Sequence, residues 1–212
     1  MARNPERTRK SIMDSAEELI LQYGFSGTTV SAVIEKAGVT KGAFFHHFDT
    51  KVDLGHALVE RYAALDAEHL ERTMTRAERL SRDPLQQLLI FIDLLKEEMD
   101  ALTQPYPGCL FASYCYQAGL FDEKTLEVAR EAMRNWRDQV GEKLREAAAR
   151  HSIAANVDPD SVAGMLLNVL EGSFVLSKAL GDPRVVAEQL GHYRNYVELL
   201  FAAKPAPTGH VS

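Results

Sequence analysis

Residues 37–54 read AGVTKGAFFHHFDTKVDL. Near the start of this stretch, Gly38, Val39 and Thr40 have the composition of a tight turn between two helices. Glycine permits the reversal, valine packs between the helices, and the threonine hydroxyl caps the helix that follows. Residues 29–48 are therefore expected to form a helix-turn-helix, whose second helix lies in the major groove of DNA. Any helical hairpin shares this pattern, so the turn by itself leaves both interpretations open.

Apolar residues follow a helical spacing on both sides of this stretch. Upstream, we expect the first helix to end at Gly24, because glycine suits a left-handed C-terminal cap. Downstream, Thr50 and Asp53 form a capping-box pattern that predicts the start of a long helix. Three Asp-Pro pairs, at 83–84, 158–159 and 182–183, each predict a further helix start.

The chain is therefore expected to be all-α, with about nine helices and no sheet. We divide it into a small N-terminal three-helix domain over residues 1–50, a larger helical domain over 51–203, and a Pro/Gly-rich, disordered tail over 204–212. The expected helices span residues 6–23, 30–37, 41–48, 51–78, 84–102, 109–118, 122–150, 159–180 and 183–203.

The composition of the chain excludes several classes of protein. Of its 212 residues, 46% are hydrophobic and 25% are charged, as in a foldable, water-soluble chain. No stretch approaches 18 uncharged apolar residues, which argues against a membrane span, and the N-terminus does not resemble a secretory signal. Two cysteines, Cys109 and Cys115, are too few for a disulfide framework or a four-thiolate zinc site, so a reducing cytoplasm is expected.

The charge distribution is compatible with DNA binding by the N-terminal part only. The net charge is −6, but residues 1–51 hold seven Lys and Arg against six Asp and Glu. A near-neutral head on an acidic body can engage DNA locally while the body repels it.

Catalytic motifs are not found in the sequence. It contains no Gly-rich phosphate loop, nucleophile elbow, His-Glu-x-x-His or Cys-x-x-Cys pattern. We therefore expect no enzyme, no cofactor and no metal site. A helical scaffold without a DNA function is the remaining alternative, and it predicts no salt-dependent binding to DNA.

Residues 37–54 resemble the DNA-binding signature of the TetR family of transcriptional regulators, and GFSGTTV at 24–30 fits the usual link between its first two helices. The resemblance by motif covers about residues 8–58. It implies an all-helical homodimer with an N-terminal DNA-binding domain and a C-terminal effector-binding and dimerisation domain. The implied function is a repressor that binds a palindromic operator and is released by a small-molecule effector. A ligand-dependent activator of the same family is the alternative.

The residues expected to contact DNA lie on or beside the second helix of the motif. Phe44 and Phe48, four residues apart, should face the core, which leaves the other side of this helix for the groove. Phe45 stands where the family usually has Tyr, so one hydroxyl contact is lost. Adjacent residues point about 100° apart on a helix, so His46 and His47 do not suit a shared metal. The expected contacts are Thr29, Thr40, Lys41, Gly42, Ala43, Phe45, His46, His47 and Lys51, with a basic lead-in of Arg3, Arg7, Arg9 and Lys10.

In the resembled family, the last two helices pair with their twofold mates into a four-helix interface. The alternative is that both helices are ordinary core. The apolar stripes assigned to this interface are Val162, Leu166, Val169, Ser173 and Leu176 in the first helix, and Leu190, Tyr193, Val197, Leu200 and Phe201 in the second.

Binding sites in helical bundles form between helices, so the middle helices are expected to enclose the effector. The sequence Gly108-Cys109-Leu110 resembles a helix start in subgroups of the family that include regulators answering to small electrophiles or unsaturated acids. Near a helix N-terminus a thiol ionises more readily, so Cys109 is a candidate sensor, against the alternative of a small buried hydrophobe. The candidate lining residues are Phe91, Leu95, Met99, Cys109, Ser113, Tyr116, Gln117, Trp136, Asn168 and Glu171.

Overall fold

The computed structural model describes residues 5–154 and 157–202. The tail expected at 204–212 lies outside the described residues, as does Arg3 of the basic lead-in.

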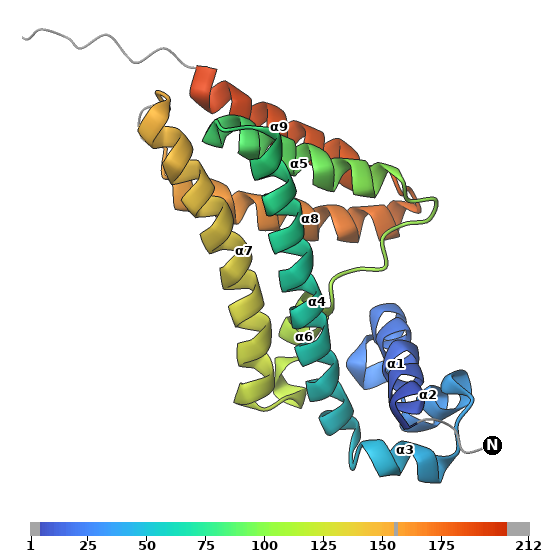
Figure 1. Cartoon of the computed structure of the whole chain (residues 1–212). Coiled ribbons are helices and arrows are strands. Elements are labelled where there is room, and N and C mark those ends of the chain that lie inside the picture. Colours follow the sequence, from blue (N-terminus) through green and yellow to red (C-terminus); the bar gives the residue numbers. More distant parts are fainter. Residues whose placement is uncertain (1–4, 155–156, 203–212) are drawn as a thin grey trace, which may run out of the picture. The chain divides into compact units, whose positions relative to one another are not determined.

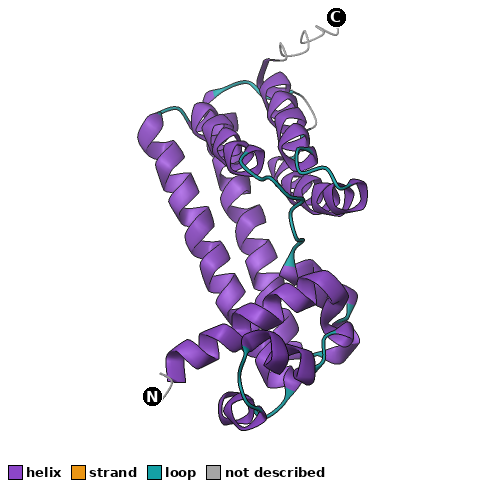
Figure 2. Ribbon diagram, turned by 90° about the vertical axis from the view of Figure 1, so that its right-hand side faces the viewer, coloured by secondary structure: helices purple, strands orange, loops and turns teal. Residues whose placement is uncertain are grey.

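Within the described part of the chain, the structure contains nine α-helices, one short 3-10 helix and no strand (Figures 1 and 2). The prediction of an all-α chain with about nine helices is confirmed, while the 3-10 helix η1 was not predicted. The elements are α1 (Pro5–Gly27), α2 (Val30–Ala37), α3 (Lys41–His47), α4 (Lys51–Leu80), α5 (Pro84–Asp100), α6 (Leu110–Tyr116), η1 (Ala118–Leu120), α7 (Glu123–Arg150), α8 (Pro159–Leu180) and α9 (Val185–Ala202).

Helix ends follow the capping residues read from the sequence, with two exceptions. Asp83 and Asp158 cap α5 and α8 as predicted, but α9 begins at Val185, so Asp182 is not its cap. The first helix does not end at Gly24. The chain is kinked there, at φ 76°, and α1 continues past the kink to Gly27.

The chain forms two compact units, and each is described by itself. The first unit joins Met1–Asp66 to Pro107–Ala132, so it contains α1, α2, α3, the first part of α4, α6, η1 and the start of α7. Here α1 packs against α2, α3 and α6. The buried core includes Ile12, Ile20, Phe25, Phe44, Leu54 and Leu58.

The second unit joins Ala67–Tyr106 to Met133–Ser212. In it, α9 packs along both α5 and α8, as the adjacent green, orange and red ribbons of Figure 1 show. The buried core includes Phe91, Ile92, Trp136, Leu166, Leu190 and Tyr193. This division by packing differs from the expected division at residues 50 and 51, because α6 packs against α1 and residues 107–132 are grouped with the first unit.

One helix, α8, is long and apolar enough to cross a membrane by length and composition alone. Only 28% of its most apolar window is buried in the structure. The exposed apolar residues of α8 are Val175, Leu176 and Leu180. The helix thus presents an apolar surface that residues 5–154 and 157–202 do not cover.

Candidate nucleic-acid interface

The turn between α2 and α3 is closed by backbone hydrogen bonds. Gly38 adopts the left-handed conformation, at φ 61° and ψ 38°, which glycine reaches without steric cost. Its N–H donates to the Glu35 carbonyl at 3.1 Å, and the Val39 N–H donates to the Ile34 carbonyl at 3.2 Å. This pair of bonds is a Schellman motif, which ends α2 and turns the chain into α3.

Threonines begin both helices of the motif. The Thr29 hydroxyl accepts from the Ala32 N–H, and the Thr40 hydroxyl accepts from the Ala43 N–H, each at 3.1 Å. The capping role predicted for Thr40 is confirmed, and Thr29 caps α2 in the same way. A capping box at Thr50 and Asp53 likewise begins α4, with the Asp53 N–H donating to the Thr50 hydroxyl at 3.1 Å.

Two buried phenylalanines fix the rotation of α3. Phe44 is fully buried and Phe48 nearly so, with ring centroids 5.9 Å apart, as their four-residue spacing predicted. Because these rings anchor one side of the helix, its opposite side is directed to solvent. Of the exposed residues of α3, Gly42 and His46 lie on that opposite side, while Lys41 and Phe45 flank the buried rings.

The exposed residues of α3 include a small residue, Gly42, and a cation, Lys41. A Cβ added to Gly42 would meet nothing within 4 Å, so the protein's own packing does not require a glycine at this position. A glycine does allow another surface to approach the backbone closely. The Lys41 ammonium lies 6.0 Å from the Phe45 ring centroid. The arrangement suits a helix that approaches the edges of bases in a groove.

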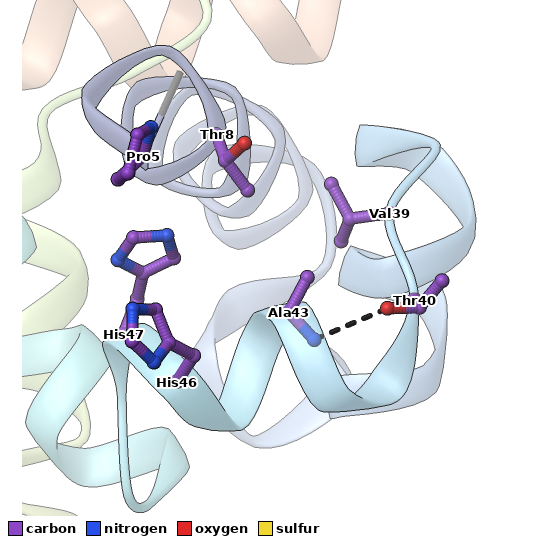
Figure 3. Close-up of a pocket in the computed structure, with 7 residues that line it drawn as sticks. All are labelled: Pro5, Thr8, Val39, Thr40, Ala43, His46 and His47. Carbon is purple, nitrogen blue, oxygen red and sulfur yellow. Dashed lines mark hydrogen bonds between the residues drawn. The ribbon is translucent and has the colours of Figure 1, made fainter. Parts of the chain in front are cut away.

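A hollow of about 420 Å³ lies between the start of α1, the turn before α3 and α3 itself. Figure 3 shows the imidazoles of His46 and His47 on α3 next to one another, with Pro5 and Thr8 of α1 on the other side. His46 is exposed and His47 is half-buried. The remaining lining residues are Val39, Thr40 and Ala43.

The basic side chains that were expected to contact DNA also contact groups of their own chain. The Lys51 ammonium lies 4.3 Å from the Phe25 ring centroid, and burial lowers the pKa of this side chain. The Arg9 guanidinium lies 5.3 Å from the Phe48 ring, and Lys10 pairs with Asp14 at 2.7 Å. Lys51 thus stabilises the core of the first unit by cation–π contact, in addition to any role toward DNA.

Helix α6 and the residue that follows it are hydrogen-bonded to α1 and α4, a connection that the sequence did not predict. The Gln117 amide, directly after α6, donates to the Ser26 hydroxyl at 2.9 Å and accepts from the Ser26 N–H at 3.2 Å. The buried Tyr114 hydroxyl donates to the Gly55 carbonyl of α4 at 2.7 Å. A Cβ added to Gly55 would lie only 2.8 Å from the Phe25 ring, so the packing here favours a glycine.

The candidate effector residues are divided between the two units. Cys109, Ser113, Tyr116 and Gln117 belong to the first unit, and the other six belong to the second. Phe91, Leu95 and Trp136 are buried in the apolar core of the second unit, where Phe91 and Trp136 are in ring contact. Met99 and Glu171 are half-buried.

Four of these expectations need correction. Asn168 was expected to line an effector site enclosed between helices, but it is exposed. Tyr116 is 84% exposed, so it does not line an enclosed cavity in this chain. Gln117 has its amide engaged with Ser26, because the residues after α6 return to the link between α1 and α2. Cys109 is half-buried and is the N-cap residue of α6, rather than part of its first turn.

The expected dimer residues also need correction. Val162, Leu166, Leu190, Tyr193, Val197 and Leu200 are buried in the core of the second unit. Their side chains pack inside their own chain, so they do not supply an external interface. Ser173 is buried, and its hydroxyl donates to the Val169 carbonyl, while Val169 and Phe201 are partly buried against the same core. Of the ten residues, Leu176 alone is exposed, at 49%.

Other apolar residues of the last two helices are directed outward. They are Val175 and Leu180 in α8, and Tyr196 and Leu199 in α9. Both helices are apolar on more than one side, so the periodicity did not reveal which apolar side faces the core. Among the described residues, no group of three or more His, Cys, Asp and Glu side chains is arranged to hold a metal ion.

Comparison with known proteins relates both parts of the chain to one family. The family model of bacterial regulatory proteins of the tetR family matches residues 12–58, and that of the tetracyclin repressor-like C-terminal domain matches residues 84–193. The transcriptional regulator AcuR of Cereibacter sphaeroides is 27% identical over 169 residues, which cover 80% of this chain and 75% of AcuR. The transcriptional repressor NemR of Escherichia coli is 36% identical over 76 residues, 36% of this chain and 38% of NemR.

A solved structure has the same fold over most of its length. The TetR-family regulator from Agrobacterium tumefaciens superposes with a TM-score of 0.74 at 22% identity, covering 93% of this chain and all of that one. The match extends beyond the helix-turn-helix to the helices that follow it.

Proposed function

Since the chain belongs to the TetR family of bacterial transcriptional regulators, we propose that it is a homodimeric repressor that binds a palindromic operator and is released by a small-molecule effector. The observation that carries the DNA-binding part is the anchoring of α3. Phe44 and Phe48 are buried against the core, while Lys41, Gly42 and Phe45 are exposed and leave the backbone at Gly42 open to a close approach.

Each DNA-contacting residue has a role that its position supports. Lys41 reaches a guanine edge or a phosphate, while Gly42 and Ala43 let the backbone of α3 approach the groove. Phe45 supplies an apolar contact. His46, His47 and the hydroxyls of Thr29 and Thr40 serve phosphates at the edge of the groove. Lys51 contributes at most in part, because its ammonium already lies over Phe25.

Dimerisation is proposed through the outward apolar side of α8 and α9. Val175, Leu176, Leu180, Tyr196 and Leu199 form this outer apolar face. Covering it with the same face of a second copy would bury large side chains that otherwise meet water. The two DNA-reading heads would then be held at the separation of two half-sites.

The remaining assignments follow from the family. Residues 1–50 are proposed as the DNA-binding domain and 51–203 as the effector-binding and dimerisation domain, in a cytoplasmic protein without catalytic activity or membrane attachment. The apolar character of α8 is accounted for by the dimer interface. Of the candidate effector residues, Met99, Cys109, Ser113 and Glu171 are half-buried, and we retain them as sites of contact.

The proposal is tested by binding the purified protein to duplex DNA from the intergenic region upstream of its own gene. A scrambled duplex of equal length is the control. Preferential binding that weakens steeply with salt supports the proposal, and binding to neither duplex, nor to any genomic fragment at low salt, contradicts it. A reporter placed behind the bound DNA distinguishes repressor from activator.

Thiol sensing is a second form of release, favoured by the position of Cys109 at the N-terminus of α6. Methylglyoxal or a quinone is added to the protein–DNA complex, with Cys109→Ser as the test variant and Cys115→Ser as the matched control. Release that is lost only in Cys109→Ser supports sensing. Release that is unchanged in Cys109→Ser, or absent in the wild type, rejects it.

A further inference from the structure

The hollow between α1 and α3 is lined by two adjacent imidazoles and by no carboxylate. Its seven lining residues are Pro5, Thr8, Val39, Thr40, Ala43, His46 and His47. The two imidazole centroids are 5.1 Å apart, with the rings nearly perpendicular. The two rings and the Thr40 cap thus stand on the helix that is proposed to read DNA (Figure 3).

The charged groups around these rings favour the neutral form of His47 in the free protein. Loss of hydration, with the positive charges of His46 on α3 and Arg9 on α1, lowers the pKa of His47. The acidic residues nearest in sequence, Glu6 and Asp49, are exposed and do not line the hollow. No carboxylate of the lining therefore compensates a positive charge on the imidazoles.

A DNA phosphate beside the two rings would instead favour the protonated form of the imidazoles. A phosphate monoanion within hydrogen-bonding reach stabilises imidazolium and raises its pKa. When the pKa of a group is higher in the complex than in the free protein, binding takes up a proton, and affinity increases as the pH falls.

We propose that DNA binding by this chain is coupled to proton uptake at the hollow lined by His46 and His47, so that operator affinity rises as the pH falls from about 8 to about 6. This inference rests on the proposed function, and it adds a form of regulation to the same site. In this proposal the imidazoles beside the hollow gain a proton when a phosphate binds, whereas a lysine or arginine in the same place would be charged at all times.

The test measures operator affinity by fluorescence anisotropy at constant ionic strength between pH 6 and pH 8. Uptake of one proton per dimer over one pH unit lowers the dissociation constant about tenfold, and a fall of this size is expected for the wild type between pH 8 and pH 6. The variant His46→Gln/His47→Gln is expected to lose this dependence, with affinity constant within about twofold. His69→Gln, in the second unit, is the matched control and is expected to retain the wild-type dependence.

A charge-restoring variant separates protonation from structural support. His46→Lys/His47→Lys carries its charge throughout this pH range, so it is expected to bind at pH 8 at least as tightly as the wild type at pH 6. Circular dichroism confirms that each variant is folded. Wild-type affinity that is flat with pH, or a dependence that survives in the double glutamine variant, overturns the inference. Failure of the wild type to bind DNA at any pH overturns the proposed function instead.

Discussion

The side-chain amide of Gln117 forms two hydrogen bonds with Ser26, 91 residues earlier in the chain. One bond runs from Gln117 Nε2 to Ser26 Oγ at 2.9 Å, and the other from Ser26 N to Gln117 Oε1 at 3.2 Å. Ser26 lies in the last turn of α1, directly before the Thr29 cap of α2, and Gln117 lies at the end of α6. The end of α6 is therefore hydrogen-bonded to the segment that leads into the helix-turn-helix.

A double-mutant cycle on Gln117 and Ser26 measures this connection. Gln117→Ala and Ser26→Ala are each expected to lower the free energy of unfolding by about 0.5–1.5 kcal/mol, because each weakens or removes this pair of hydrogen bonds. The double variant should lose little more than one single variant. Chemical denaturation gives the energies, with the exposed Gln22→Ala as control. Fully additive losses would show that the two side chains do not act as a pair.

Two glycines are expected to respond oppositely to a methyl group. Gly55→Ala places a Cβ 2.8 Å from the Phe25 ring, and this overpacking should cost about 1–3 kcal/mol of stability. Gly42→Ala meets nothing within 4 Å, so it should leave the fold intact or stabilise α3, while weakening DNA binding. Thermal unfolding and DNA-binding assays on both variants test this pair. A Gly42→Ala protein that binds DNA as tightly as the wild type would contradict the close approach proposed for α3.

The outer apolar face of α8 and α9 is expected to hold the dimer together. Leu176→Glu and Leu199→Glu place charges at positions that are 49% and 68% exposed in the single chain. Each variant should remain folded but sediment as a monomer, with operator affinity reduced because the two half-sites are no longer bound together. Leu80→Glu, at a 63% exposed position in α4, is the control and should remain dimeric. Persistent dimers in both test variants would place the interface elsewhere.

The pairing of Asp83 with His151 makes the second unit sensitive to acid. The Asp83 carboxylate accepts from the Gln86 N–H at 3.1 Å and lies 2.5 Å from His151 Nε2. The hydrogen bond from His151 lowers the pKa of Asp83. Since the pKa is lower in the folded state, the stability contributed by ionised Asp83 is present above the unfolded value of about 4 and is lost as the pH falls through the folded value.

Thermal unfolding of Asp83→Ala and the wild type between pH 3 and pH 6 tests this contribution. The variant should lose about 1–2 kcal/mol at pH 5–6, where the cap and the pair are both intact. The difference should shrink as the pH falls below about 4, because Asp83 of the unfolded chain becomes protonated before Asp83 of the folded chain. Asp138→Ala, at an exposed position, is the control. A difference that stays constant down to pH 3 would contradict the assignment.

The sequence predicted those parts of the fold that depend on neighbouring residues. The caps at Thr29, Thr40 and Asp83 and the left-handed Gly38 depend on local chemistry, and all are present in the structure. The inward Phe44 and Phe48 likewise follow from spacing along a single helix.

Features that depend on distant residues could not be read in this way. The bonds of Gln117 to Ser26 and of Tyr114 to Gly55 join segments 91 and 59 residues apart, and no local pattern specifies such pairs. The prediction of which apolar side of α8 faces outward was wrong for a related reason. Leu166 and Leu176 are equally apolar, and the packing of distant segments such as α9 against α8 decides that the first is buried and the second exposed.

The central claim is that α3 reads DNA, and the salt dependence of operator binding tests it most directly. Wild type, Lys41→Ala and the control Lys96→Ala are titrated against the operator duplex over a range of salt concentrations. Lys41→Ala is expected to weaken binding about tenfold or more and to reduce the slope of log K against log salt by about two per dimer, one for each head. Lys96→Ala should leave both quantities unchanged. Lys41→Ala binding with wild-type affinity and slope would contradict the claim.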